Sequence, residues 1–277
     1  MTVTSRVKTL ALLLCLTAAA MAGCKRKEAA PKPGAAPAAE APAPVPADAA
    51  APFAYAAKSP QAEVSLKLPA ILARQPDLHA RLYSEGVRDL KAFAEGAQED
   101  HGEEGADLPP YTREVEWQAS GETGKLLTLR KQTYEYTGGA HPNSVLDALV
   151  WDKAMKRQIA PASLFRAKAD FAALDAALCE AVTAARRERV GADFQPDPQS
   201  FPCPKWREST YVLAPSTNGG RAGGLTFLFS PYAVGAYAEG PYEITVPLSV
   251  FQAALAPAYA DEFDGAPARV GDVTPRT

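Results

Sequence analysis

The chain has 277 residues, with 29 lysines and arginines against 32 aspartates and glutamates, so its formal net charge is −3. A nearly balanced charge without a basic block argues against nucleic acid as a partner. The sequence after residue 60 has the length of one large domain or two small packed domains, and it contains no apolar run long enough to span a membrane.

Residues 1–23 have the pattern of a secretory signal peptide, in which Arg6 and Lys8 precede an apolar run over residues 10–20. The sequence Met-Ala-Gly then stands directly before Cys24, which resembles the lipobox of bacterial lipoproteins. This resemblance implies cleavage before Cys24 and a lipid on its thiol, so we expect a membrane-anchored protein. An ordinary signal peptide followed by an incidental cysteine is the alternative.

Residues 24–60 are predicted to be a lipidated, disordered tether because they are mostly alanine and proline. Fully extended, at about 3 Å per residue, the tether would reach roughly 100 Å. Lys25 follows the cysteine, where an aspartate would signal inner-membrane retention. By resemblance to enterobacterial sorting rules, we expect the periplasmic face of the outer membrane. A proline-rich ligand motif is the alternative interpretation of this segment.

Residues 61–152 are predicted to form an N-terminal α+β half. Alternating apolar residues predict a strand at 61–68, and apolar residues at helical spacing predict a helix over 72–93 with a fresh start at Pro76. His79 falls in this helix and is expected at its surface or boundary.

An acidic, glycine-bearing segment at residues 96–110, which contains His101, is predicted to be a loop. Its carboxylates do not follow the spacing of an EF-hand, so we expect no metal there. Alternating patterns then predict an antiparallel meander of three strands, with a glycine-bounded turn after the first strand: residues 111–120, 125–136 and 145–151.

Residues 153–260 are predicted to form the C-terminal half, and residues 261–277 a loose tail. Asp170 is a plausible cap for a long helix that ends at Gly191. Arginines near the end of this helix suit its dipole and are expected to form a solvated face: Arg186, Arg187 and Arg189. Strands are predicted at 208–214, 225–229 and 242–246, and a short helix at 248–255. The fold class is therefore α+β, with antiparallel sheets covered by two long helices.

The cysteines predict one disulfide. Cys15 would leave with the signal peptide and Cys24 would carry lipid, which leaves Cys179 and Cys203 as a pair in an oxidising compartment. Two free or metal-binding thiols are the alternative. We expect no cofactor and no metal.

Two motifs carry a family resemblance: the segment Tyr136-Thr-Gly-Gly-Ala-His-Pro142, and Phe229-Ser-Pro-Tyr232 with the nearby Tyr237. Together they resemble the extracellular domain of the lysozyme-sensing anti-sigma factor RsiV, over roughly residues 61–256. The first half of that domain also occurs in peptidoglycan deacetylases such as PdaC, outside the catalytic domain. The resemblance implies an α+β domain that faces the cell envelope. Signalling to a sigma factor is not implied, because we expect a lipid anchor in place of a membrane-spanning helix.

These motifs supply the candidate binding residues: Tyr136, Gly138, Gly139, His141, Tyr232 and Tyr237. Aromatic side chains beside shaped turns are suitable contact residues. We therefore expect a non-enzymatic binding module for an envelope partner, either a lysozyme-type protein or a peptidoglycan component. A purely structural role of the tyrosines and glycines is the alternative at this site.

The enzymatic alternative is a periplasmic, cell-wall-directed hydrolase in which His141 activates Ser144 or Ser230 and Asp147 orients the imidazole ring. No Gly-x-Ser-x-Gly or His-Glu-x-x-His motif supports it. The preferred interpretation is that His141 hydrogen-bonds within its own glycine turn, and we expect no enzyme.

Overall fold

The computed structural model describes residues 51–104, 108–191 and 193–275. All of them belong to one compact unit, which spans residues 47–277. The predicted signal peptide, Cys24 and most of the predicted tether lie outside the described residues. None of the described helices combines the length and apolarity that crossing a membrane requires.

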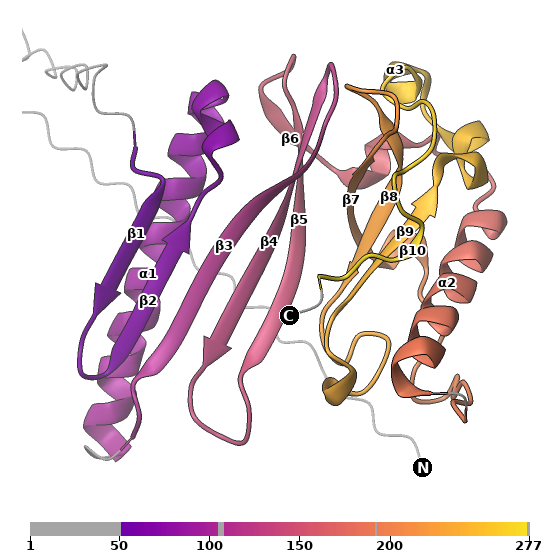
Figure 1. Cartoon of the computed structure of the whole chain (residues 1–277). Coiled ribbons are helices and arrows are strands. Elements are labelled where there is room, and N and C mark those ends of the chain that lie inside the picture. Colours follow the sequence, from indigo (N-terminus) through magenta and orange to yellow (C-terminus); the bar gives the residue numbers. More distant parts are fainter. Residues whose placement is uncertain (1–50, 105–107, 192, 276–277) are drawn as a thin grey trace, which may run out of the picture. The chain divides into compact units, whose positions relative to one another are not determined.

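The first sheet has six strands in the order in which they occur in the chain (Figure 1). They are β1 (Ala54–Lys58), β2 (Ala62–Lys67), β3 (Tyr111–Glu122), β4 (Leu126–Tyr136), β5 (Asn143–Asp152) and β6 (Arg157–Ile159). The predicted meander is confirmed, since β3, β4 and β5 pair antiparallel. The sheet is mixed, however, because β2 and β3 are parallel. Their connection is the long helix α1 (Pro76–Glu104), and a crossover of that length permits parallel pairing.

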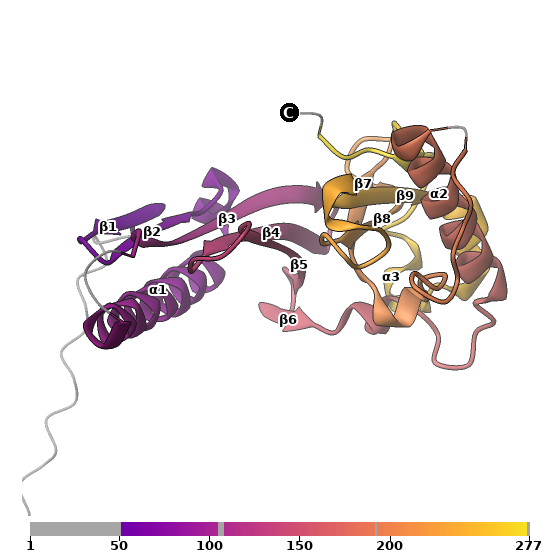
Figure 2. The same ribbon diagram turned by 90° about the horizontal axis from the view of Figure 1, so that it is seen from below.

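Helix α1 covers one face of the first sheet (Figure 2). Alternate strand residues such as Leu66, Val115 and Leu129 point to this face and are buried against Leu78 and Leu90 of the helix. The period of two in the strands and the helical period in α1 therefore meet in one apolar layer.

The second sheet is antiparallel, with the strand order β10-β9-β8-β7. Its strands are β7 (Thr210–Pro215), β8 (Ala222–Phe229), β9 (Tyr242–Pro247) and β10 (Gly271–Asp272). Helix α2 (Ala172–Val190) packs on this sheet with Leu174, Leu178 and Val182 fully buried, as its pattern predicts. The short helix α3 (Pro257–Ala260) completes this part of the chain. The fold is thus α+β with two long helices, as predicted.

Close contacts join the two sheets. Gly121 of β3 lies so near β7 that a Cβ atom on it would be 2.6 Å from the carbonyl oxygen of Leu213. The Leu213 amide also donates to the Thr128 hydroxyl at 3.2 Å. Arg130 of β4 pairs with Glu243 of β9 at 2.8 Å, and both side chains are 10% exposed.

The start of the folded part differs from the prediction. Residues 54–58, assigned to the tether, form β1 and pair antiparallel with β2. Phe53 also accepts a hydrogen bond from the Leu68 amide and stacks on the ring of His79 at 4.1 Å. The prediction failed because β1 is alanine-rich like the tether and is held by backbone pairing.

The helix α1 also differs from the prediction, since it continues to Glu104 through the segment predicted as an acidic loop. Gly96 and Gly102 have no atom near their Cβ positions, so they lie on the open side of a helix that continues past them. His79, expected at the surface or boundary, is 4% exposed, and its Nε2 lies 3.2 Å from the carbonyl oxygen of Pro52. His101 is buried beside Tyr111, with ring centroids 5.0 Å apart.

The C-terminal segment is the third difference. The predicted helix at 248–255 consists of two 3₁₀ turns, Leu248–Val250 and Gln252–Ala254. The predicted loose tail is ordered as far as residue 275: Phe263 is buried in the core, and β10 pairs with β9. Its contacts come from residues far back in the chain, which local patterns do not reveal.

Candidate functional site

The site is built from two turns that come from different sheets. One connects β4 to β5 over residues 137–142, the other connects β8 to β9 over residues 230–241, and both lie at the lower edge in Figure 1. In the first turn Gly138 and Gly139 have φ values of +91° and +92°, which glycine adopts without strain. The expectation of a shaped bend at this motif is thereby met.

His141 in the first turn contacts two tyrosines of the second. Its ring stacks on Tyr237, with centroids 3.9 Å apart and an interplanar angle of 21°. Its Nε2 lies 3.5 Å from the hydroxyl of Tyr232, and its Nδ1 lies 2.9 Å from the carbonyl oxygen of Pro142. The two motifs of the sequence therefore meet in space.

Two further hydrogen bonds hold the turns together. The Tyr237 hydroxyl donates to the Pro142 carbonyl oxygen at 2.7 Å, and this bond joins residues 95 positions apart. The Tyr136 hydroxyl donates to the Gly139 carbonyl oxygen at 3.2 Å and so braces the glycine turn from β4. We call Tyr136, His141, Tyr232 and Tyr237 the aromatic cluster.

Tyr232 is an exposed tyrosine of the aromatic cluster, and His141 is exposed as well. Tyr232 is 59% exposed, and its φ is +71°, in the left-handed region. For a bulky residue this conformation costs on the order of 1–2 kcal/mol. The Ala233 amide donates to the Ser230 carbonyl oxygen at 3.0 Å and closes the turn around it. The surrounding structure therefore holds a large aromatic ring out in solvent at a conformational cost.

A depression of about 390 Å³ adjoins the aromatic cluster. It lies over β3 and β4 and is lined by Thr112, Glu114, Glu116, Gln132, Tyr134 and Tyr136. Tyr136 belongs to both features, so the cluster continues onto a polar sheet surface that carries carboxylates, an amide and hydroxyls.

The groups of the hydrolase alternative have other partners. The Ser230 hydroxyl accepts from the Leu146 amide at 2.9 Å, and the Ser144 hydroxyl accepts from the Gln132 side chain at 3.4 Å. Within the described residues no hydrogen bond joins His141 to either serine. Across the same part of the chain, no group of three or more histidine, cysteine, aspartate or glutamate residues is placed to hold a metal ion.

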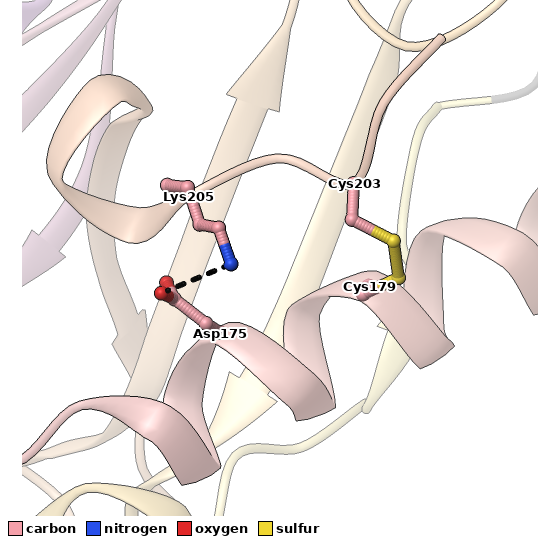
Figure 3. Close-up of a disulfide and its surroundings, with 4 residues drawn as sticks. All are labelled: Asp175, Cys179, Cys203 and Lys205. Carbon is pink, nitrogen blue, oxygen red and sulfur yellow. Dashed lines mark ion pairs between the residues drawn. A yellow bond between two sulfur atoms is a disulfide. The ribbon is translucent and has the colours of Figure 1, made fainter. Parts of the chain in front are cut away.

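Cys179 and Cys203 are joined in the structure, with Cα atoms 5.1 Å apart (Figure 3). The predicted pairing is therefore geometrically available. The bond attaches the irregular segment after α2 to the middle of that helix, close to an ion pair between Lys205 and Asp175 at 3.6 Å.

The expectation of a solvated arginine face on α2 is wrong for Arg186, whereas Arg189 is exposed and ion-paired. Arg186 is 8% exposed, and its guanidinium donates to both carboxylate oxygens of Glu239 at 2.8 Å. Arg189 donates to Asp272 at 2.7 Å and to the carbonyl oxygens of Glu239 and Pro241. The glutamate lies 53 residues from Arg186, so helix periodicity gives no sign of the pair.

The electrostatics of this pair favour ionisation of the glutamate. Burial by itself would raise the pKa of Glu239, but hydrogen bonds from Arg186, Tyr242 and the Ala236 amide outweigh it and lower that pKa to about 2. Burial and the same carboxylate raise the pKa of Tyr242, so its phenol remains a hydrogen-bond donor.

Comparison with known proteins identifies two domain types. A family model described as "Deacetylase PdaC" matches residues 56–144, and a model described as "Protein of unknown function (DUF3298)" matches residues 162–249. The chain therefore carries a PdaC-like domain followed by a DUF3298 domain. The two motifs of the aromatic cluster are divided between them.

Two solved structures are similar to this chain. A DUF3298 family protein from Pseudomonas aeruginosa PAO1 is similar over 78% of this chain and 94% of its own, with 14% identity and a TM-score of 0.52. A DUF3298 family member from Bacteroides fragilis NCTC 9343 covers 73% of this chain and 88% of its own, with 18% identity and a TM-score of 0.43. The first likeness concerns the fold alone, and the second is too weak to carry an argument. No curated protein matches the chain.

Proposed function

We propose that this chain is a lipid-anchored envelope protein that acts as a non-enzymatic binding module, with the aromatic cluster as its contact surface. The observation that carries the proposal is Tyr232, an exposed ring in a left-handed conformation beside the stacked pair of His141 and Tyr237. Strain of this kind persists where the surrounding structure imposes it, and it is concentrated at functional sites.

The arrangement suits binding because its rings are already in place. His141 and Tyr237 are fixed by stacking and by hydrogen bonds to the Pro142 carbonyl oxygen. Ordering them for a partner therefore costs little conformational entropy, and aromatic anchors of this type dominate many interfaces. Tyr232 adds a projecting ring and a free edge for contact.

The partner we propose is a lysozyme-type protein or a peptidoglycan component at the periplasmic face of the outer membrane. The lipobox-like sequence before Cys24 supports the anchor. The PdaC-like and DUF3298 domains, and the resemblance to the lysozyme-sensing anti-sigma factor, support the class of partner. The polar depression over β3 and β4 supplies donors and acceptors next to the rings.

Binding is preferred over hydrolysis because the structure offers rings in place of an activated nucleophile. Among the described residues, neither Ser144 nor Ser230 is hydrogen-bonded to His141; their hydroxyls accept from Gln132 and from the Leu146 amide. Catalysis by His141 would need a nucleophile within hydrogen-bond reach.

Titration calorimetry of the full chain with a c-type lysozyme, and separately with muropeptides, tests this proposal. We expect micromolar or tighter binding of one of them, and at least a tenfold weaker Kd for Tyr232→Ala. The matched control is Val270→Ala, which removes another exposed apolar side chain, 59% exposed, outside the cluster. Absence of binding at micromolar concentrations would discard these partners. Equal weakening by both variants would place the contact elsewhere.

A further inference from the structure

We propose that Arg186 and Glu239 position Tyr237, and with it the aromatic cluster, and that the disulfide-closed loop keeps this ion pair in place. The proposal concerns regulation of the site described above and rests on its proposed binding role. The geometry that it predicts can nevertheless be measured without any ligand.

The first step runs from Glu239 to Tyr237. Both belong to one 3₁₀ turn, Tyr237–Glu239. The Glu239 carboxylate folds back to accept from the Ala236 amide at 2.9 Å, which fixes the entry of this turn, and it accepts from the Tyr242 hydroxyl at 2.7 Å at the start of β9. One carboxylate therefore ties together both sides of the turn that presents Tyr237.

The carboxylate fills its site closely. A Cβ atom on Gly235 would lie 2.5 Å from Oε2 of Glu239, so a methyl group at this position would have to displace the carboxylate. Arg186 binds the same two oxygens from α2 with parallel hydrogen bonds, a geometry that fixes orientation as well as charge. Arg189 adds hydrogen bonds to the carbonyl oxygens of Glu239 and Pro241.

The second step runs from Tyr237 to the other turn. Its hydroxyl donates to the Pro142 carbonyl oxygen, and its ring stacks on His141. Displacement of the turn that carries Tyr237 would therefore move the hydrogen bond and the stack together. The ring of Tyr232, 5.5 Å from that of Tyr237, would lose its neighbour as well.

The third step runs from Arg186 to the disulfide. The guanidinium lies over Phe194 at 4.7 Å and over Phe201 at 4.9 Å from the ring centroids. Both phenylalanines belong to the segment that Cys203 attaches to Cys179 of α2. The two rings cover the ion pair on the loop side, and the covalent bond limits how far they can move away.

This bond is open to thiol exchange because Cys203 is exposed. A dithiol reductant would cleave it in two displacements: the reductant gives up two electrons and leaves as its own disulfide, and Cys179 and Cys203 take up protons as free thiols. We expect reduction to loosen the phenylalanine cover and thereby to weaken the placement of Tyr237.

Proton NMR of the full chain tests the positioning directly. The chain has three histidines, and the ring current of Tyr237 should displace the carbon-bound protons of His141 upfield. His79 and His101 lie in α1 and serve as internal reporters of folding. Tyr237→Leu removes the ring and shows how large the upfield shift of the His141 protons is. We expect Glu239→Ala to lose more than half of it and Glu239→Gln, which keeps an oxygen acceptor, to lose less.

Two further variants keep the test decisive. Gly235→Ala should displace the carboxylate by contact and reproduce the effect of Glu239→Ala without removing any group. Glu180→Ala removes an exposed carboxylate of α2 that has no ion pair among the described residues and should change nothing. If the His141 protons kept their full upfield shift in both Glu239→Ala and Gly235→Ala, with the signals of His79 and His101 unaltered, the positioning role would be overturned.

Reduction supplies the last comparison. Cleavage of the disulfide by a dithiol should make the upfield shift of the His141 protons smaller in the wild type. It should have little further effect in Glu239→Ala, because both changes act on the same series of contacts. An unchanged wild-type spectrum after complete reduction would overturn the role of the loop. None of these readouts involves a partner, so failure of the calorimetric test of binding would leave them interpretable.

Discussion

Arg130–Glu243 and Arg186–Glu239 are both ion pairs in which each side chain is 10% exposed, yet they connect different things. The first joins β4 of one sheet to β9 of the other through a single 2.8 Å bond between Nε and Oε1. The second uses two bonds of 2.8 Å to fix one turn beneath the aromatic cluster. Equal burial therefore does not mean an equal role. The first pair joins two sheets, whereas the second joins α2 to the turn that carries Tyr237.

The largest expected effect separates these roles by stability. Glu243→Ala leaves Arg130 buried without its carboxylate at the junction of the sheets, and we expect a loss of about 3–5 kcal/mol in the free energy of unfolding. Chemical denaturation measures it. Glu116→Ala, at an exposed position of β3, is the control and should cost less than about 0.5 kcal/mol. If Glu243→Ala lost less free energy of unfolding than Glu239→Ala, the comparison between the two ion pairs would be reversed.

The next effect is a dependence on pH that belongs to Glu239. Its pKa in the folded protein is about 2 against an ordinary value of 4.5, so the unfolded chain binds the proton more readily. The resulting stabilisation, on the order of 2 kcal/mol, is fully present above pH 4.5 and is lost as the pH falls to about 2.

The measurement is the difference in unfolding free energy between the wild type and Glu239→Gln across this pH range. We expect the difference to shrink as the pH falls. Asp272 also has a lowered pKa, because hydrogen bonds from Thr274 and Arg189 outweigh its burial, and the Ser200 hydroxyl lowers the pKa of Asp197. The wild-type curve alone would therefore mix several carboxylates. A difference that is constant with pH would remove Glu239 as the source.

The smallest expected effect lies at the exposed end of the aromatic cluster. Tyr232→Asn places a residue that tolerates the left-handed region at a φ of +71°, so we expect stability to stay equal or to rise by up to about 1 kcal/mol. Binding of the partner should weaken at least tenfold, as expected for Tyr232→Ala. Tyr237→Asn is the contrasting variant, because it removes the hydrogen bond to the Pro142 carbonyl oxygen and should lower stability. A destabilised Tyr232→Asn would show that this ring supports the fold.

Much of the fold could be predicted because the signals are local. Alternating residues and glycine turns predict the meander, and β3, β4 and β5 lie within a few residues of the predicted bounds. The start of α1 at Pro76 and the stop of α2 before Gly191 follow from residues at the ends themselves. The bounds failed where composition misled: alanines in β1 resemble the tether, and glycines within α1 resemble a loop.

The residues of the candidate site could be predicted from the sequence, but the contacts that hold them in place could not. Tyr136, His141, Tyr232 and Tyr237 stand out as aromatic residues in two short motifs, and the structure brings them together. Glu239 and Arg186 were missed, because a buried arginine and a solvated one look alike on a helix whose partner is distant. Glu239 is only two residues from Tyr237, but nothing in the local sequence indicates that its side chain turns toward Arg186.

Local features of this protein can be predicted from its amino-acid sequence: the period of most strands and helices, the left-handed bend at Gly138 and Gly139, and the two cysteines available for pairing. These depend on backbone preferences and on residues a few positions apart. Three other features depend on tertiary packing: β2 and β3 are parallel, His79 is buried, and Glu239 pairs with Arg186. Such contacts join residues tens of positions apart, and only the packing of the sheets and helices brings them within bonding distance.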